Sequence, residues 1–166
     1  MTIVIVCSLI CSIFVIHKIN FNRLEMTGKI SPELFEWKEE YGVGVEAIDE
    51  HRKKFFEIIN KLKKVILGRD CKTNVADVFF SLVHYAEHYL IQEEIYFKES
   101  GYAGFSDHQE THNNFIKRII KFKEDFQNGK PEVCEEMYFY LEDWLVTHIM
   151  HYDTQAVNWL KERGVK

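Results

Sequence analysis

The sequence has few residues that interrupt helices and no excess of positive charge. Its 166 residues include two prolines, and long stretches hold neither proline nor glycine, which favours helices over many short strands. The formal net charge of -5 and the isoelectric point near 5.9 argue against a nucleic-acid partner. Hydrophobic residues make up 46% of the chain, which is enough for the core of one domain of ordinary size.

Cysteine motifs with a recognisable spacing are also absent. The four cysteines form no CxxC pair and no zinc-ribbon spacing. Two of them lie in the apolar N-terminal stretch, and the other two are isolated in the sequence. We therefore expect Cys7, Cys11, Cys71 and Cys134 to be free thiols in a reducing compartment.

Residues 2–16 form an uncharged apolar run of fifteen residues. A membrane-spanning helix needs about 20 apolar residues, with a lower limit near 17, so the run is slightly short unless its neighbours extend it. A secretory signal is not expected, because no positive charge precedes the run and no small residues end it. We predict a membrane anchor at residues 1–22 and a linker at residues 23–34. A buried helix and a wrongly assigned start codon are the alternatives.

Three basic residues, Lys18, Arg23 and Lys29, follow this run. Positive charges beside a spanning helix favour the cytoplasmic side. The sequence therefore predicts a single-pass protein of the inner (cytoplasmic) membrane, with its main domain on the cytoplasmic side. Without the anchor, the protein would be cytoplasmic.

Four later stretches carry apolar residues at helical spacing. Three of them are 47–67, 74–98 and 106–127, and Pro131 suits the first turn of the fourth. Short loops between helices of roughly 20 residues are typical of an antiparallel bundle. We predict an all-α fold, an up-down-up-down four-helix bundle at residues 35–162, preceded by the N-terminal transmembrane segment.

Histidines and carboxylates recur within all four stretches. The candidates are His51, His88, Glu93, His108, His112, His148 and Asp153. His108 and His112 are four apart and share a helix face, whereas His148 and Asp153 are five apart and reach one centre if the helix bends slightly. A single core histidine is better explained as a satisfied polar residue, but burying so many uncompensated groups would cost several kcal/mol.

Coordination of a metal ion would offset the cost of burying these histidines and carboxylates. Imidazole nitrogens with carboxylate oxygens, and no thiolate, suit iron or manganese better than structural zinc. Because carboxylates can bridge two ions inside a bundle, the pattern favours a dinuclear centre.

From about Phe35 to Leu160 the chain resembles the hemerythrins, and bacteriohemerythrins in particular. The resemblance is carried by FEWKEEYGVGVEAID, EEIYFKESGY, HQETHNNF and WLVTHIMHYD. It implies an iron held by His108, His112 and His148, with Glu93 and Asp153 bridging to a second iron. Two further histidines, one from each of the first two helices, would hold that second iron.

The chain departs from the family pattern at those last two positions. The expected histidines fall on Arg52 and Tyr89, and His51 and His88 each stand one residue early. One residue corresponds to about 100° of helix rotation. A π-type bulge and a frayed first helix would still bring His88 and His51 inward. Alternatively, Tyr89 or solvent holds the second iron, or that iron is absent, or the bundle is free of metal. We expect two irons, with one as the alternative.

The resemblance implies reversible O2 binding without turnover of a substrate, and hence O2 carriage, delivery or sensing rather than enzymatic activity. Trp144, Leu145 and Ile149 are the candidates to line an apolar O2 pocket. The alternatives are a mono- or di-iron oxidoreductase acting on peroxide, nitric oxide or ferrous iron, and a membrane-tethered signalling module. The expected partners are O2 and, through the N-terminal segment, a membrane. The sequence identifies no protein partner.

Overall fold

The computed structural model describes residues 30–164 of the chain. The chain divides into two compact units, Met1–Leu34 and Phe35–Lys166, and the helices of the described residues belong to the second unit. A short 3-10 turn, η1, precedes four long helices, of which the second and the fourth each contain a π-helical segment. The elements are η1 (Glu39–Tyr41), α2 (Glu46–Leu67), α3 (Cys71–Tyr85), η2 (Ala86–Leu90), α4 (Ile91–Glu99), α5 (Phe105–Gln127), α6 (Val133–Trp144), η3 (Leu145–Tyr152) and α7 (Asp153–Lys161).

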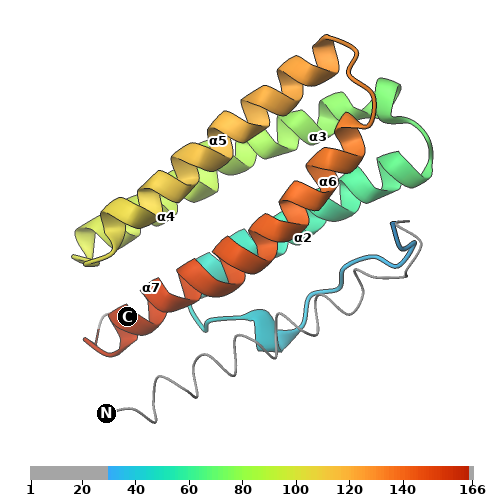
Figure 1. Ribbon diagram of the computed structural model, residues 1–166. Coiled ribbons are helices and arrows are strands. Elements are labelled where there is room, and N and C mark those ends of the chain that lie inside the picture. The colour runs from blue at the N-terminus through green and yellow to red at the C-terminus, as the bar shows by residue number, and fades with distance from the viewer. Residues whose placement is uncertain (1–29, 165–166) are drawn as a thin grey trace. The chain divides into compact units, whose positions relative to one another are not determined.

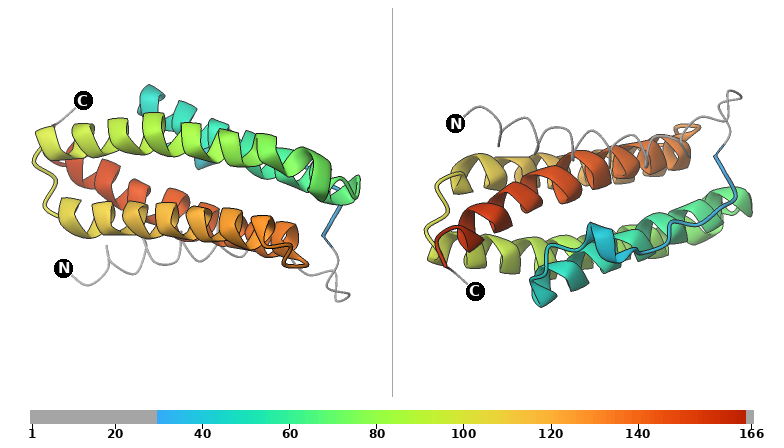
Figure 2. Two further views of the ribbon diagram at one scale, coloured as in Figure 1. Left: turned by 90° about the horizontal axis from the view of Figure 1, so that it is seen from above. Right: turned by 90° about the horizontal axis from the view of Figure 1, so that it is seen from below.

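The four long helices form an antiparallel bundle. The second runs through α3, η2 and α4 without a break, and the fourth runs through α6, η3 and α7 (Figure 1). Short loops join successive helices at alternate ends, which makes sequence neighbours antiparallel (Figure 2). No strand occurs between residues 30 and 164. The all-helical bundle predicted from the sequence is therefore confirmed.

Helix α2 shows why the apolar pattern located the helices well. Phe55, Ile59 and Leu62 recur at helical spacing, and none of the three side chains is exposed to solvent. Asp49 fixes the start of the helix, because its carboxylate accepts hydrogen bonds from the backbone N–H groups of Val43 (2.7 Å) and Gly44 (3.0 Å). The first helical stretch thus begins one residue before the expected boundary.

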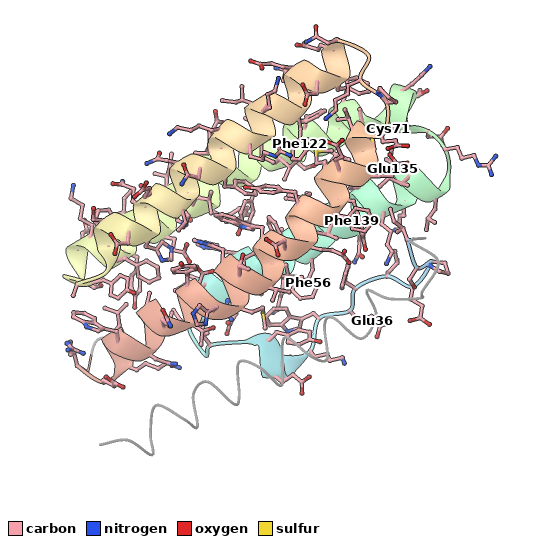
Figure 3. All side chains as sticks on the ribbon, viewed as in Figure 1. Glu36, Phe56, Cys71, Phe122, Glu135 and Phe139 are labelled. Atoms are coloured by element: carbon pink, nitrogen blue, oxygen red, sulfur yellow. A yellow bond between two sulfur atoms is a disulfide. The ribbon has the colours of Figure 1, made fainter. Side chains whose placement is uncertain are left out.

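Two other helix starts differ from the sequence prediction. The second helix begins at Cys71 rather than at residue 74, and α6 begins at Val133, so Pro131 lies in the preceding turn rather than in the helix. Figure 3 labels Phe56 and Phe122, both buried, among the aromatic side chains that fill the bundle.

A disulfide links Cys71 and Cys134. The expectation of a free thiol is therefore wrong for both residues. They are 63 positions apart in sequence, and only the fold brings the starts of α3 and α6 to the same end of the bundle (Figures 1 and 3). A cross-link over such a long loop lowers the entropy of the unfolded chain. Cys7 and Cys11 lie outside the described residues.

The predicted membrane-spanning segment requires a correction. Across residues 30–164, no helix combines the length and the apolar character needed to cross a bilayer. The predicted anchor, residues 1–22, lies outside the described residues, and its fifteen-residue apolar run is shorter than the roughly 20 residues that a span requires. For residues 30–164 the fold class is therefore corrected to an all-α four-helix bundle, and the transmembrane segment is no longer part of the assignment. The single-pass localisation at the inner membrane is withdrawn with it.

Candidate metal centre

The fourth helix changes to π geometry where the histidine and the carboxylate of its HxxxxD motif lie. In the π-helix η3, hydrogen bonds join residues five apart instead of four. This geometry places His148 and Asp153 on the same inner face. His148 Nε2 lies 3.1 Å from Asp153 Oδ1, and both side chains are buried. The slight bend expected from the sequence is this π segment.

Helices α4 and α5 bring further ligand atoms to the same place. Glu93 Oε2 lies 3.4 Å from the Nε2 atoms of both His108 and His112. One ligand atom from each of Glu93, His108, His112 and His148 lies within 4.8 Å of all the others. Among residues 30–164 this is the one group of three or more such side chains that could hold a metal. Asp153 lies beside the group, with its Oδ1 3.5 Å from His108 Nε2.

Hydrogen bonds outside this group determine which ring nitrogens face inward. The Thr111 hydroxyl donates to the carbonyl oxygen of His108 (2.6 Å), so at 2.9 Å it can only accept from Nδ1 of His148. The Glu94 carboxylate accepts from Nδ1 of His112, also at 2.9 Å. When neutral, both imidazoles therefore turn an unprotonated Nε2 toward the centre, as a metal ligand must.

The separations between these atoms fit a metal ion. The contacts within the centre range from 2.9 Å, between the Nε2 atoms of His112 and His148, to 3.5 Å. Ligands bound at about 2.1 Å and between right-angled and tetrahedral directions lie about 3.0 to 3.4 Å from one another. His108 Nε2 and Asp153 Oδ1 are buried without a hydrogen-bond partner. Nitrogen and carboxylate donors without thiolate suit iron or manganese.

The electrostatics of the centre also favour a cation. Burial raises the pKa of Glu93, but the neighbouring imidazoles of His108 and His112 outweigh burial and hold this pKa below its usual range. Burial and the negative charge of Glu93 raise the pKa of Asp153. Burial lowers the pKa of His112, yet its hydrogen bonds with Glu93 and Glu94 raise it to about 9. The site thus retains protons that a divalent ion could replace.

Arg52 and His51 lie next to the carboxylates but are not part of the ligand group. Arg52 is 2% exposed, and its positive charge lowers the pKa of Asp153, opposing burial and Glu93. The ring of His51 lies 4.8 Å from the ring of Tyr89, and its Nδ1 has no hydrogen-bond partner. Burial lowers the pKa of His51, whereas the charges of Glu93 and Asp153 raise it.

The structure does not bring His88 to the group. A π segment, Ala86–Leu90, occurs where a bulge was expected, but it ends before Glu93. The last three residues of the step from His88 to Glu93 are therefore α-helical, and in an α-helix two residues five apart differ by about 140° beyond a full turn. His88 is exposed, and its ring lies 4.2 Å from the ring of His84, whereas Glu93 is buried.

The three predicted lining residues are buried beside the centre. The Trp144 ring stacks on the His148 ring, with 4.0 Å between centroids and 13° between planes. Leu145 and Ile149, which lie on η3 with His148, have no exposed surface. The Trp144 ring therefore limits the access of water to one face of His148.

Sequence reasoning missed Thr111 and the structural role of Arg52. Thr111 lies between two candidate ligands in sequence, but only the fold shows that it contacts His148. Glu94 likewise contacts His112 from behind the ligand group, at its Nδ1 atom. For Arg52 the sequence does indicate that a cation at a ligand position opposes a second metal ion, but it does not indicate the hydrogen bonds to Tyr41 and Thr154.

Inward-facing histidine and carboxylate side chains from α4, α5 and the fourth helix define a metal-binding four-helix bundle. The family model for the hemerythrin HHE cation binding domain matches residues 43–160, so the chain belongs to the hemerythrin family. The resemblance inferred from the sequence is thereby confirmed. In this family the bundle is a non-haem iron-binding domain.

Individual relatives agree with this assignment. Bacteriohemerythrin from Clostridium acetobutylicum is 28% identical over 129 residues, which cover 75% of this chain and all of the relative. Bacteriohemerythrin from Pseudomonas aeruginosa is 30% identical over 122 residues, covering 74% of this chain and 78% of the relative. A hemerythrin-like protein from Naegleria gruberi is 25% identical over 134 residues, covering 81% and 95% of the two chains.

Proposed function

We propose that this protein holds iron at its buried centre and binds O2 reversibly there, in O2 carriage, delivery or sensing. The observation that carries the proposal is the convergence of three imidazoles and the Glu93 carboxylate in one buried group, with the Asp153 carboxylate beside it. The residues that would hold the iron are His108, His112, His148, Glu93 and Asp153. Iron supplies a redox-active Lewis acid, and an octahedral ion has room for one ligand beyond these five. Membership of the hemerythrin family supports the choice of iron and is consistent with O2 as the ligand.

The chain's own residues set the conditions at the iron. Thr111 and Glu94 orient two of the imidazoles through their Nδ1 atoms. Trp144, Leu145 and Ile149 exclude water from the side of the fourth helix, and we assign them to the O2 pocket. A dry and preorganised site favours reversible binding of a small apolar ligand over its reaction with protons.

The test uses the full chain, stripped of metal and reloaded with ferrous iron without oxygen. Elemental analysis should then find iron, and the optical spectrum should change on adding O2 and return when O2 is removed. His148→Ala should lose iron, whereas the control His84→Ala, at an exposed histidine, should retain it. Absence of iron in the wild-type protein would contradict the iron function. Irreversible oxidation on first exposure would contradict reversible binding.

A second candidate function is an oxidoreductase acting on peroxide, nitric oxide or ferrous iron. It is favoured by Arg52 and Tyr89 at the positions where the family resemblance implies ligands of a second iron. Such an altered centre is less suited to reversible O2 binding by an iron pair. Catalytic consumption of one of these substrates by the iron-loaded protein, absent from His148→Ala, would support this function over O2 binding.

A further inference from the structure

Arg52 is among the largest fully buried side chains of the described chain. Its side chain reaches from α2 to the fourth helix, where Nη2 donates a hydrogen bond to the Thr154 hydroxyl at 2.9 Å. On the other side, Nη1 donates to the carbonyl oxygen of Tyr41 in η1 at 2.6 Å. Both acceptors are neutral, so these bonds hold the guanidinium in place without balancing its charge. A buried guanidinium needs a compensating negative charge nearby.

That compensation comes from the metal centre. Thr154 directly follows Asp153, so the hydrogen bond to Thr154 holds the guanidinium beside the centre. The buried carboxylates of Glu93 and Asp153, and the partly exposed carboxylate of Glu94 behind His112, carry three negative charges when ionised, and Arg52 balances one of them. The two that remain match a single divalent ion. A second divalent ion would leave uncompensated positive charge in a buried site, which costs several kcal/mol.

The side chains around Arg52 do not provide a second set of ligands. Tyr89 is half-buried and offers a phenol oxygen in place of an imidazole nitrogen. His51 offers one unpaired ring nitrogen, but it is not part of any group of three potential ligands among residues 30–164. His88 is exposed on another face of its helix. The core therefore has converging metal ligands around His108, His112 and His148, whereas the fixed cation of Arg52 occupies the position next to them.

From these observations we propose that Arg52 is a permanent internal cation that takes the place of a second metal ion, so that the centre holds one divalent ion per chain. The proposal rests on the proposed function for the identity of that ion as iron. It makes Arg52 a specificity-determining residue, which sets the number of ions through charge and not through coordination.

The experiment measures ferrous iron bound per full-length chain, by anaerobic titration followed by elemental analysis. Wild-type protein should bind one iron. Arg52→His combined with Tyr89→His removes the cation and supplies two imidazoles, and should raise the content to two. The matched control is Arg118→His with Tyr140→His. This is another neighbouring arginine and tyrosine pair, on α5 and α6, with Arg118 Cζ 5.9 Å from the centre of the Tyr140 ring. The control should stay at one. Circular dichroism verifies that each variant is helical.

The outcomes separate this inference from the proposed function. Two irons in the wild-type protein would overturn the role of Arg52 and leave the iron function intact. One iron in both the wild-type protein and the folded Arg52→His/Tyr89→His variant would also overturn it, because removal of the cation would then have no effect. No iron in the wild-type protein would overturn the proposed function itself. If the double variant does not fold, the wild-type count still decides between one ion and two.

Discussion

His112 and His148 face each other across the core with their Nε2 atoms 2.9 Å apart. Because Glu94 and Thr111 engage the two Nδ1 atoms, neutral imidazoles at this distance would direct two lone pairs at each other. Either a proton or a metal ion must lie between them. The pair is therefore stable only when it holds a cation, and the surrounding carboxylates favour a divalent one.

Iron loading should stabilise the protein. A ligand that binds only the folded state adds about 2.7 kcal/mol at a free concentration 100 times its Kd. For a domain of this size that corresponds to a rise of roughly 5 to 11 °C in Tm. Differential scanning calorimetry with and without ferrous iron, under anaerobic conditions, measures the shift. The control is His112→Ala/His148→Ala, whose Tm should not respond to iron. An equal rise in that variant would place the stabilising ion elsewhere.

Thr111→Val should weaken iron binding without changing the number of ions. The substitution keeps the shape of the side chain but removes the acceptor for Nδ1 of His148. Loss of such an orienting partner typically reduces metal affinity by about 10- to 100-fold. Competition with a chelator gives the affinity. Thr147→Val is the control, because the Thr147 hydroxyl is exposed and bonds only the backbone of its own helix. Similar affinities for the two variants would show that the contact does not orient His148.

Arg52→Met should destabilise the metal-free protein. It removes hydrogen bonds to Tyr41 and Thr154 and leaves buried carboxylates without their cation. Breaking one side of a buried charge arrangement costs about 3 to 5 kcal/mol in the free energy of unfolding. Urea denaturation followed by circular dichroism measures this loss. Arg118→Met, at an exposed arginine over the Phe122 ring, should cost less than about 1 kcal/mol. A neutral effect of Arg52→Met would contradict the internal-cation role.

His51→Phe and His88→Ala should leave the iron content unchanged. Neither histidine joins the group formed by Glu93 with His108, His112 and His148. His51 is buried against Tyr89, and His88 is exposed. Elemental analysis of each reloaded variant gives the count. Loss of one iron from either variant would support the intact iron pair that the family resemblance implies.

The bundle could be predicted from sequence because its helices are strongly amphipathic. The spacing of Phe55, Ile59 and Leu62 alone indicates a buried helical face, and their complete burial bears this out. Boundaries were less predictable, since α3 begins at Cys71 before any apolar repeat is visible. The Cys71–Cys134 disulfide depends on contact across the bundle, which no local pattern reports.

The candidate centre was predictable only in part, for geometric reasons. His108 and His112 share a face in any α-helix, so their spacing was informative by itself. His148 and Asp153 share a face only because a π segment lies between them. The sequence predicted a slight bend at this place but not that the bend is a π-helix. At His88 the same five-residue offset proved uninformative, because η2 ends three residues before Glu93, whereas η3 extends to the residue directly before Asp153. A histidine and a carboxylate five residues apart therefore share a helix face in one case and not in the other, depending on where the π segment lies.

The most direct test of the central claim is an anomalous difference map at the iron absorption edge, from crystals of the ferrous-loaded full-length protein. We expect one strong peak, within bonding distance of the Nε2 atoms of His108, His112 and His148. The absence of a peak at this position, or a stronger peak at another set of residues, would contradict the assignment of these side chains as the iron site.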